Sequence, residues 1–151
     1  MKPSLLVAVL LPLSIPLLSA ETPPPAVPAA AAASAVQHLD APAAAKVLEK
    51  AAKTPEKSIA ILDVRTPEEF ASGHLKGAQN LDIASADFQK NLAKLDPSKT
   101  WLVHCAAGGR STRTLGLLNK LGFKSIIHLD GGLNGWKKAG LPLEKPTPAA
   151  K

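Results

Sequence analysis

The chain has one cysteine, Cys105, and it stands where an apolar stretch meets a glycine-rich turn. The surrounding run, residues 101–112, reads WLVHCAAGGRST. This pattern predicts a strand that ends at a thiol, followed by a tight loop and the first turn of a helix. A thiolate is a strong nucleophile, so Cys105 is the candidate catalytic residue of the chain.

The residues after Cys105 suit the binding of an anion. Glycines let backbone N–H groups converge in a concave nest, and a helix N-terminus directs the positive end of its dipole to the same place. Such surroundings lower the pKa of a cysteine from about 8.5 to roughly 3.5–7.5. The residues predicted to line the nest and bind substrate are Ala106, Ala107, Gly108, Gly109, Arg110 and Ser111.

Arg110 is the cation of this loop, since Ala106 and Ala107 carry no charge. Its guanidinium group offers a fixed positive charge and a planar fork of donors to an anionic, oxygen-bearing substrate. A second interpretation is that the same group caps backbone carbonyls of its own loop. A simpler alternative for Cys105 is a buried core cysteine, but that role leaves the Gly-Gly-Arg sequence unexplained.

Three further motifs accompany the loop: ILDVRTPEEF at 61–70, GHLKGA at 73–78 and LDGGLNGW at 129–136. Together, and in this order, they resemble the single-domain rhodaneses, and the resemblance covers roughly residues 36–142. It implies an α/β fold with a central parallel sheet and a cysteine that carries sulfur as a persulfide. The chain departs from the family at Lys76, where proline is frequent, and at Ala106 and Ala107, where some thiosulfate-using members have basic residues.

The resemblance implies a thiosulfate sulfurtransferase-like enzyme that moves sulfane sulfur from a donor such as thiosulfate to a thiophilic acceptor. The implied partners are a small anionic sulfur donor, a thiol or cyanide acceptor and, as a further acceptor, a protein. Two alternatives stay open. One is a non-catalytic module that binds or relays sulfane sulfur. The other is a phosphatase or arsenate reductase on the same fold, although those enzymes need a loop one residue longer than the six residues from Cys105 to Arg110.

Asp63 and Arg65 end a neighbouring strand and are expected on the same rim as Cys105. They are candidates for supporting residues that orient the loop through hydrogen bonds, or that pair with Glu69. The family resemblance favours a structural ion-pair role over direct catalysis. His104 precedes the nucleophile on its strand, so its side chain is expected on the opposite face of the sheet.

Strand and helix signals alternate along the chain. Strands are predicted at 36–39, 58–64, 78–83, 101–105 and 125–129, and helices at 43–52, from Pro67, at 85–94, 111–121 and 133–138. This alternation predicts an α/β domain whose central parallel sheet of about five strands is flanked by helices on both faces. Cys105 then falls at the carboxyl ends of the strands, where such sheets bind their ligands.

The chain ends are set apart by composition. Residues 1–20 combine Lys2, the apolar run Leu5–Leu18 and a small-residue end, which predicts a cleaved signal peptide and a periplasmic or secreted protein. An uncleaved N-terminal membrane anchor is the alternative; after cleavage no stable membrane insertion is expected. An alanine- and proline-rich linker is predicted at 21–35, the rhodanese-like domain at 36–143 and a flexible tail at 144–151.

The formal charge is +6 and the pI about 9.6, but the lysines are scattered and aromatic residues make up only 3%. This distribution predicts a solvated surface rather than a nucleic-acid interface, while the positive field draws in small anions. The four histidines, His38, His74, His104 and His128, lack the close spacing of metal ligands along the chain. The sequence therefore predicts neither a metal site nor a cofactor.

Overall fold

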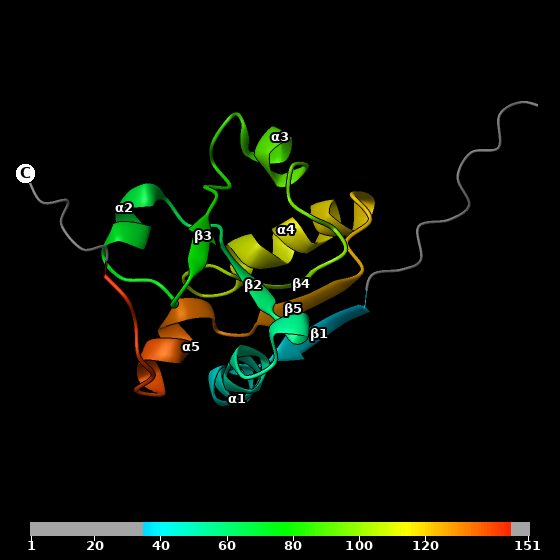
Figure 1. The fold of residues 1–151 in the computed structure, drawn as a ribbon. Coiled ribbons are helices and arrows are strands. Elements are labelled where there is room, and N and C mark those ends of the chain that lie inside the picture. Colours follow the sequence, from blue (N-terminus) through cyan, green and yellow to red (C-terminus); the bar gives the residue numbers. More distant parts are fainter. Residues whose placement is uncertain (1–34, 146–151) are drawn as a thin grey trace, which may run out of the picture.

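A parallel sheet forms the centre of the computed structural model, which describes residues 35–145 (Figure 1). Its strands pair in the order β1-β5-β4-β2-β3, every pair parallel. They are β1 (Ala35–Leu39), β2 (Ile59–Asp63), β3 (Ala78–Asn80), β4 (Thr100–His104) and β5 (Ser125–Leu129). The predicted α/β class and five-stranded sheet are confirmed.

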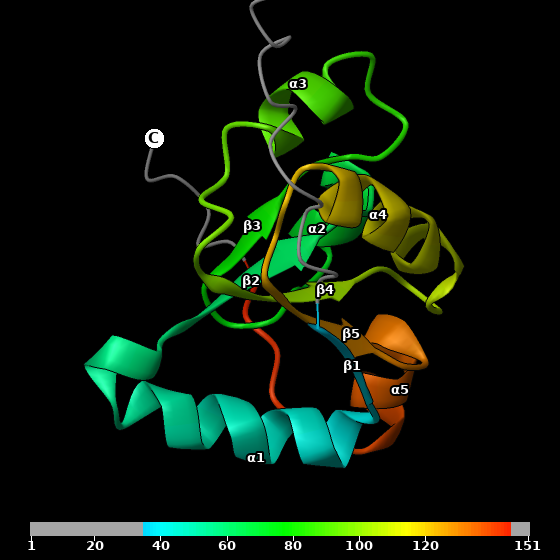
Figure 2. The same ribbon diagram turned by 90° about the vertical axis from the view of Figure 1, so that its right-hand side faces the viewer.

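Helices cover both faces of this sheet (Figures 1 and 2). They are α1 (Ala41–Ala52), α2 (Pro67–Ala71), α3 (Phe88–Leu92), α4 (Gly109–Lys120) and α5 (Gly132–Lys138), with a short 3₁₀ helix, η1 (Pro55–Lys57). One hydrophobic core joins the sheet to α3 and α4, and a second joins its other face to α1 and α5. The first core includes Cys105, and the second includes Leu129 at the carboxyl end of β5.

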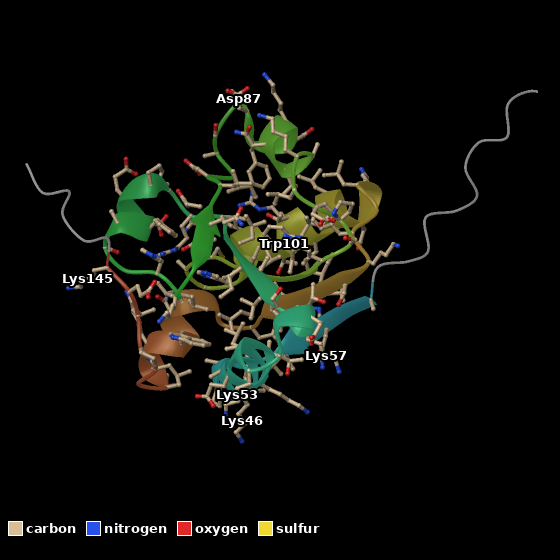
Figure 3. The ribbon with its side chains drawn as sticks, viewed as in Figure 1. Lys46, Lys53, Lys57, Asp87, Trp101 and Lys145 are labelled. Carbon is tan, nitrogen blue, oxygen red and sulfur yellow. The ribbon has the colours of Figure 1, made fainter. Side chains whose placement is uncertain are left out.

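The central strands are apolar on both faces, which is typical of a parallel sheet covered twice. On β4, Trp101 and Val103 belong to the core beneath α3 and α4, whereas Leu102 belongs to the core beneath α1 and α5. Figure 3 shows Trp101 in the interior, while Lys46 of α1 and Lys53, which directly follows α1, project away from the sheet.

Two helix starts follow the sequence signals closely. The Asp40 carboxylate accepts a hydrogen bond from the Ala43 N–H at 2.9 Å and caps α1. Thr66 and Glu69 form a capping box that starts α2 at Pro67. The capping box also fixes the backbone around Glu69.

Other boundaries differ from the prediction. β3 ends at Asn80 rather than at residue 83, and α3 begins at Phe88 rather than at residue 85. Between them, Asp82 and Ser85 accept hydrogen bonds from N–H groups two residues further on, and such local bonds compete with regular structure. In the other direction, α4 begins at Gly109, two residues before the predicted start.

The expected signal peptide and nearly all of the expected linker lie outside the described residues. At the other end, the sequence predicts a flexible tail from Glu144, yet Glu144 forms an antiparallel bridge with His74 through two 2.8 Å backbone hydrogen bonds. Among residues 35–145, no helix is both long and apolar enough to cross a membrane.

Candidate functional site

Cys105 directly follows β4 at the carboxyl edge of the sheet, as predicted. Its side chain is only 2% exposed and continues the row of Trp101 and Val103 on the α3 and α4 side. The central position of β4, between β5 and β2, places the sulfur atom in the middle of the rim.

The loop after Cys105 turns back and directs hydrogen-bond donors at the sulfur. The Gly108 N–H donates to Sγ at 3.1 Å, and the Ser111 hydroxyl lies 3.6 Å from Sγ. Gly108 has a φ of +104°, a conformation that favours glycine, and this turn directs its N–H inward. The predicted nest is therefore present, with Gly108 and Ser111 as direct contacts of the nucleophile.

The nest alters the acidity of the thiol. Burial raises the pKa of Cys105, but hydrogen bonds from the Ser111 hydroxyl and from the N–H groups of Ser111, Gly108 and Ala107 outweigh it. The pKa therefore lies below its ordinary value. Since the thiolate is the reactive form of cysteine, this environment favours the form of Cys105 that a nucleophile requires.

A second layer holds the loop from its outer side. The carbonyl oxygens of Cys105 and Ala106 accept hydrogen bonds from the N–H groups of Leu133 and Asn134, at 2.8 and 2.9 Å. A Cβ on Gly132 would lie 2.5 Å from the Cys105 carbonyl oxygen, so the close approach needs glycine there. With these carbonyls bound to α5, the N–H groups of the loop are left to face the sulfur.

Arg110 is oriented by a partner that the sequence did not indicate. Its two terminal nitrogens donate to the Glu69 carboxylate of α2 at 2.6 and 2.7 Å. This pairing lowers the pKa of Glu69 to about 2. It also raises the pKa of Arg110, and the Cys105 sulfur contributes to that increase. The guanidinium group is thus anchored by a carboxylate, and Glu69 takes only part of its five donors.

Asp63 and Arg65 form a buried ion pair with each other and not with Glu69. The Arg65 guanidinium donates to both Asp63 carboxylate oxygens, at 2.6–2.9 Å, and to the Gly73 carbonyl at 2.9 Å. Both residues are at most 2% exposed. The pair ties the end of β2 to the segment after α2, which fits the structural role that the resemblance favoured.

His104 lies against this pair and not against the nucleophile. Its Nε2 atom is 3.7 Å from an Asp63 carboxylate oxygen and has no hydrogen-bond partner among the described residues. Burial lowers the pKa of His104, which favours the neutral form of the ring. The expectation that His104 does not accept a proton from Cys105 agrees with this placement.

A hollow of about 820 Å³ lies at the opposite end of the sheet. It is lined by the first residues of four strands, Ala35, Ile59, Thr100 and Ser125. Neither the cysteine nor a histidine lines it. Ligands of parallel sheets bind beyond the carboxyl ends of the strands, so we assign the functional site to the Cys105 rim.

Sequence reasoning missed His128 as a neighbour of the loop. Its Nε2 atom is 2.9 Å from the Ser111 hydroxyl, which in turn contacts Cys105. On the other side of the ring, His128 meets His38 and Asp130. Spacing along the chain could not show this cluster, because His38 and His128 are 90 residues apart and meet only through strand pairing.

Comparison with known proteins identifies the family of this domain. The model of the rhodanese-like domain matches residues 44–139. A thiosulfate sulfurtransferase GlpE from Pseudomonas putida is 40% identical over 78 residues, which cover 51% of this chain and 68% of that protein. The chain belongs to the rhodanese-like family, whose sulfurtransferase members it matches at modest identity.

Other relatives contain the same domain either as a small part of a longer chain or as nearly the whole chain. A probable adenylyltransferase/sulfurtransferase MoeZ from Mycobacterium tuberculosis is 35% identical over 86 residues, which cover 57% of this chain but only 22% of MoeZ. A solved rhodanese-related protein from Thermoplasma volcanium matches with a TM-score of 0.60 and 27% identity, over 72% of this chain and 97% of that one.

Proposed function

We propose that the chain is a sulfurtransferase that carries sulfane sulfur on Cys105, with thiosulfate as one donor. The observation that carries the proposal is the nest of N–H and hydroxyl donors around the Cys105 sulfur, which lowers its pKa. Relatives named thiosulfate sulfurtransferase, from Pseudomonas putida and Arabidopsis thaliana, support the same chemistry.

The first half-reaction is a nucleophilic attack by the Cys105 thiolate on the outer sulfur of the donor. With thiosulfate, the S–S bond of the donor breaks, sulfite leaves with its electron pair, and Cys105 becomes a persulfide. In the second half-reaction a thiophilic acceptor attacks the outer persulfide sulfur. Cyanide leaves as thiocyanate, and the thiolate is restored without any external oxidant or reductant.

The loop suits both the thiolate and the persulfide. A second sulfur lies about 2.05 Å from the first, so it extends from the base of the nest toward its rim. Negative charge on that outer sulfur is stabilised by preorganised N–H groups, which need no reorganisation during the reaction. Arg110, fixed by Glu69, supplies a cation beside the leaving sulfite.

Exposure of the intact chain to thiosulfate tests the proposal directly. Because the chain has one cysteine, intact mass should increase by one sulfur atom, and cyanide should then remove that atom as thiocyanate. The Cys105→Ser variant should remain folded and gain no mass, because a hydroxyl group cannot hold a persulfide. An unmodified wild-type protein, or full activity in the variant, would refute the proposed role of Cys105.

The second half-reaction separates an enzyme from a relay module. A catalyst should release thiocyanate repeatedly under steady-state conditions. A module that only stores sulfur would gain the sulfur atom once and show no turnover with cyanide or small thiols. That outcome would retain the persulfide and reject the proposed enzyme.

We further propose that the protein is exported and acts in the periplasm or outside the cell. The support is the apolar run Leu5–Leu18 with its small-residue end at Ala20. N-terminal sequencing of protein recovered from the periplasm should begin at Glu21. Recovery only from membranes, with Met1 still present, would indicate the N-terminal anchor instead.

A further inference from the structure

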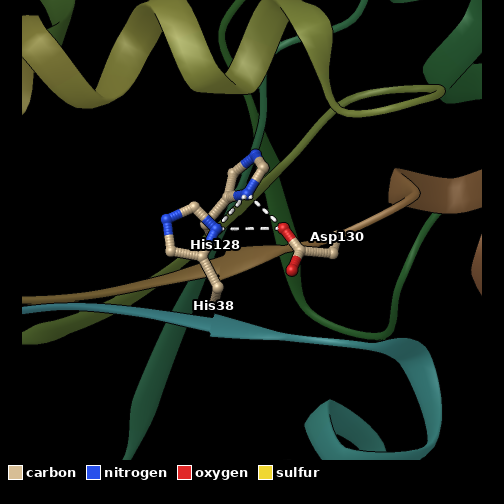
Figure 4. Close-up of side chains that lie close together, drawn as sticks. All are labelled: His38, His128 and Asp130. Carbon is tan, nitrogen blue, oxygen red and sulfur yellow. Dashed lines mark hydrogen bonds and ion pairs between the residues drawn. The ribbon is translucent and has the colours of Figure 1, made fainter.

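Three potential metal ligands meet at the carboxyl edge of β1 and β5, beside the sulfur loop (Figure 4). The His38 Nδ1 atom is 3.0 Å from an Asp130 carboxylate oxygen, and the His128 Nδ1 atom is 2.9 Å from the same oxygen. The two Nδ1 atoms are 3.3 Å apart. The three atoms thus form a small triangle with nearly equal sides.

The backbone builds this triangle. Parallel pairing of β1 with β5 sets His38 opposite His128. Asp130 is two residues beyond His128, so in extended chain its side chain points to the same face. The Asp130 N–H donates to the Leu39 carbonyl at 2.8 Å, which continues the ladder to this point. The three donor atoms are therefore brought together by main-chain register rather than by flexible surface side chains.

We propose that His38, His128 and Asp130 form a binding site for a divalent transition-metal ion of the zinc class. Two imidazole nitrogens and one carboxylate oxygen are a donor set typical of Zn²⁺. The ligand atoms are His38 Nδ1, His128 Nδ1 and Asp130 Oδ1, and water completes the coordination.

The separations fit tetrahedral coordination. Bonds of about 2.0–2.1 Å in a tetrahedron place neighbouring ligand atoms about 3.3 Å apart. The observed 2.9, 3.0 and 3.3 Å require only a small outward movement of His38 and Asp130. Their side chains are 54% and 50% exposed, so the ion has access from solvent and an open fourth position.

The third ligand is already oriented. The His128 side chain is 4% exposed, and its Nε2 atom is 2.9 Å from the Ser111 hydroxyl. Histidines that bind metals commonly donate their other ring N–H to an oxygen, which fixes the tautomer and leaves the opposite nitrogen free for the ion. The Ser111 contact gives His128 this arrangement, with Nδ1 directed at the other two ligands.

The ligand atoms can also be held together without an ion, because the His38 Nδ1–H can donate to the Asp130 carboxylate. The His128 Nδ1–H can donate there as well in the other tautomer, in which the Ser111 hydroxyl donates to Nε2. The experiment must therefore detect the ion itself. We suggest titrating untagged full-length protein with Co²⁺, followed by visible absorption, and with Zn²⁺ in a calorimeter. The expected result is one ion per chain and an absorption spectrum of tetrahedral Co²⁺.

The Cys105 thiolate also binds soft metals, so each titration is repeated with Cys105→Ser. Binding that persists in this variant supports the histidine–aspartate site. Binding that disappears assigns the ion to the thiolate and overturns the proposal.

Two ligand variants complete the test. His38→Gln and Asp130→Asn lie on separate segments and remove half-exposed groups, so loss of folding in one leaves the other to decide. Loss of a partner outside the coordination shell already weakens metal sites about 10–100-fold, so each ligand variant should weaken Zn²⁺ binding at least about tenfold. The matched control is Asp87→Asn, an exposed carboxylate directly before α3 (Figure 3) that is not part of this cluster. Unchanged Zn²⁺ affinity in a folded ligand variant would overturn the proposal.

Discussion

Two arginines on the same side of the molecule hold carboxylates in two-pronged ion pairs, but in opposite environments. The Arg65–Asp63 pair is enclosed, with side-chain exposures of 3% and 0%. The Arg110–Glu69 pair is partly open, at 26% and 36%, and the Cys105 sulfur also contributes to the raised pKa of Arg110. The same chemical pair therefore serves two purposes, as a buried structural connection and as an oriented cation beside a nucleophile.

The two ion pairs should differ in the effect of breaking them, because only the partly open pair can be hydrated by solvent. A buried charge whose partner is removed has nothing to compensate its lost hydration, whereas an exposed charge regains water. Breaking the first pair should therefore reduce stability, and breaking the second should reduce activity. Four predictions test this separation.

The largest effect is expected for Arg65→Met, which leaves the Asp63 carboxylate buried and unpaired. Removal of one partner of a buried pair costs about 3–5 kcal/mol, so the free energy of unfolding should fall by that amount in urea titrations. The double variant Asp63→Asn/Arg65→Met is the control and should recover part of the loss. A change below about 1 kcal/mol would show that the pair behaves as a surface pair.

Arg110→Ala should act on catalysis instead. Hydrogen bonds to charged groups contribute about 1.5–3 kcal/mol, so kcat/KM with thiosulfate should fall about ten- to a hundredfold, with little change in the free energy of unfolding. Arg110→Lys should recover only part of the activity, because a point charge lacks the fork geometry.

The choice of donor separates two roles of Arg110. If Arg110 binds the donor, the loss should be larger for doubly charged thiosulfate than for a neutral polysulfane. Equal losses with both donors would mean that Arg110 only holds the loop in shape.

Glu69→Gln should have a smaller effect than Arg110→Ala. The amide keeps one acceptor for Arg110 and keeps the cation, but it weakens the orientation of the guanidinium group. We expect a severalfold fall in kcat/KM for thiosulfate in steady-state assays. Activity as low as that of Arg110→Ala would instead show that the charge of Glu69 is as important as that of Arg110.

The smallest effect is the pH dependence of this partly open pair. The folded-state pKa of Glu69 is about 2, below its ordinary 4.5. The stability that it contributes is therefore complete above about pH 4.5 and is lost as the pH falls toward 2. The difference in Tm between wild type and Glu69→Gln should shrink over this interval. A difference that stays constant down to about pH 2 would mean that the carboxylate charge does not stabilise the fold.

Local sequence patterns were enough to predict most strands and helices of the domain. The alternation of strand and helix signals located the five strands, and the signals at Asp40 and Thr66 located the starts of α1 and α2. Glycines after Cys105 predicted the nest that the structure contains. Predictions failed at the end of β3 and the start of α3, where side chains such as Asp82 form local hydrogen bonds that propensity does not include.

The sequence by itself determined the candidate nucleophile and the form of its loop, because both lie within a dozen consecutive residues whose types set their local conformation. Only the tertiary structure decided which carboxylate orients Arg110, why Gly132 must be glycine, and that His38 meets His128. Each of these contacts joins segments that are distant in the chain, and strand order and register bring such segments together. Register depends on packing of the whole sheet, so it cannot be obtained from the spacing of residues along the chain.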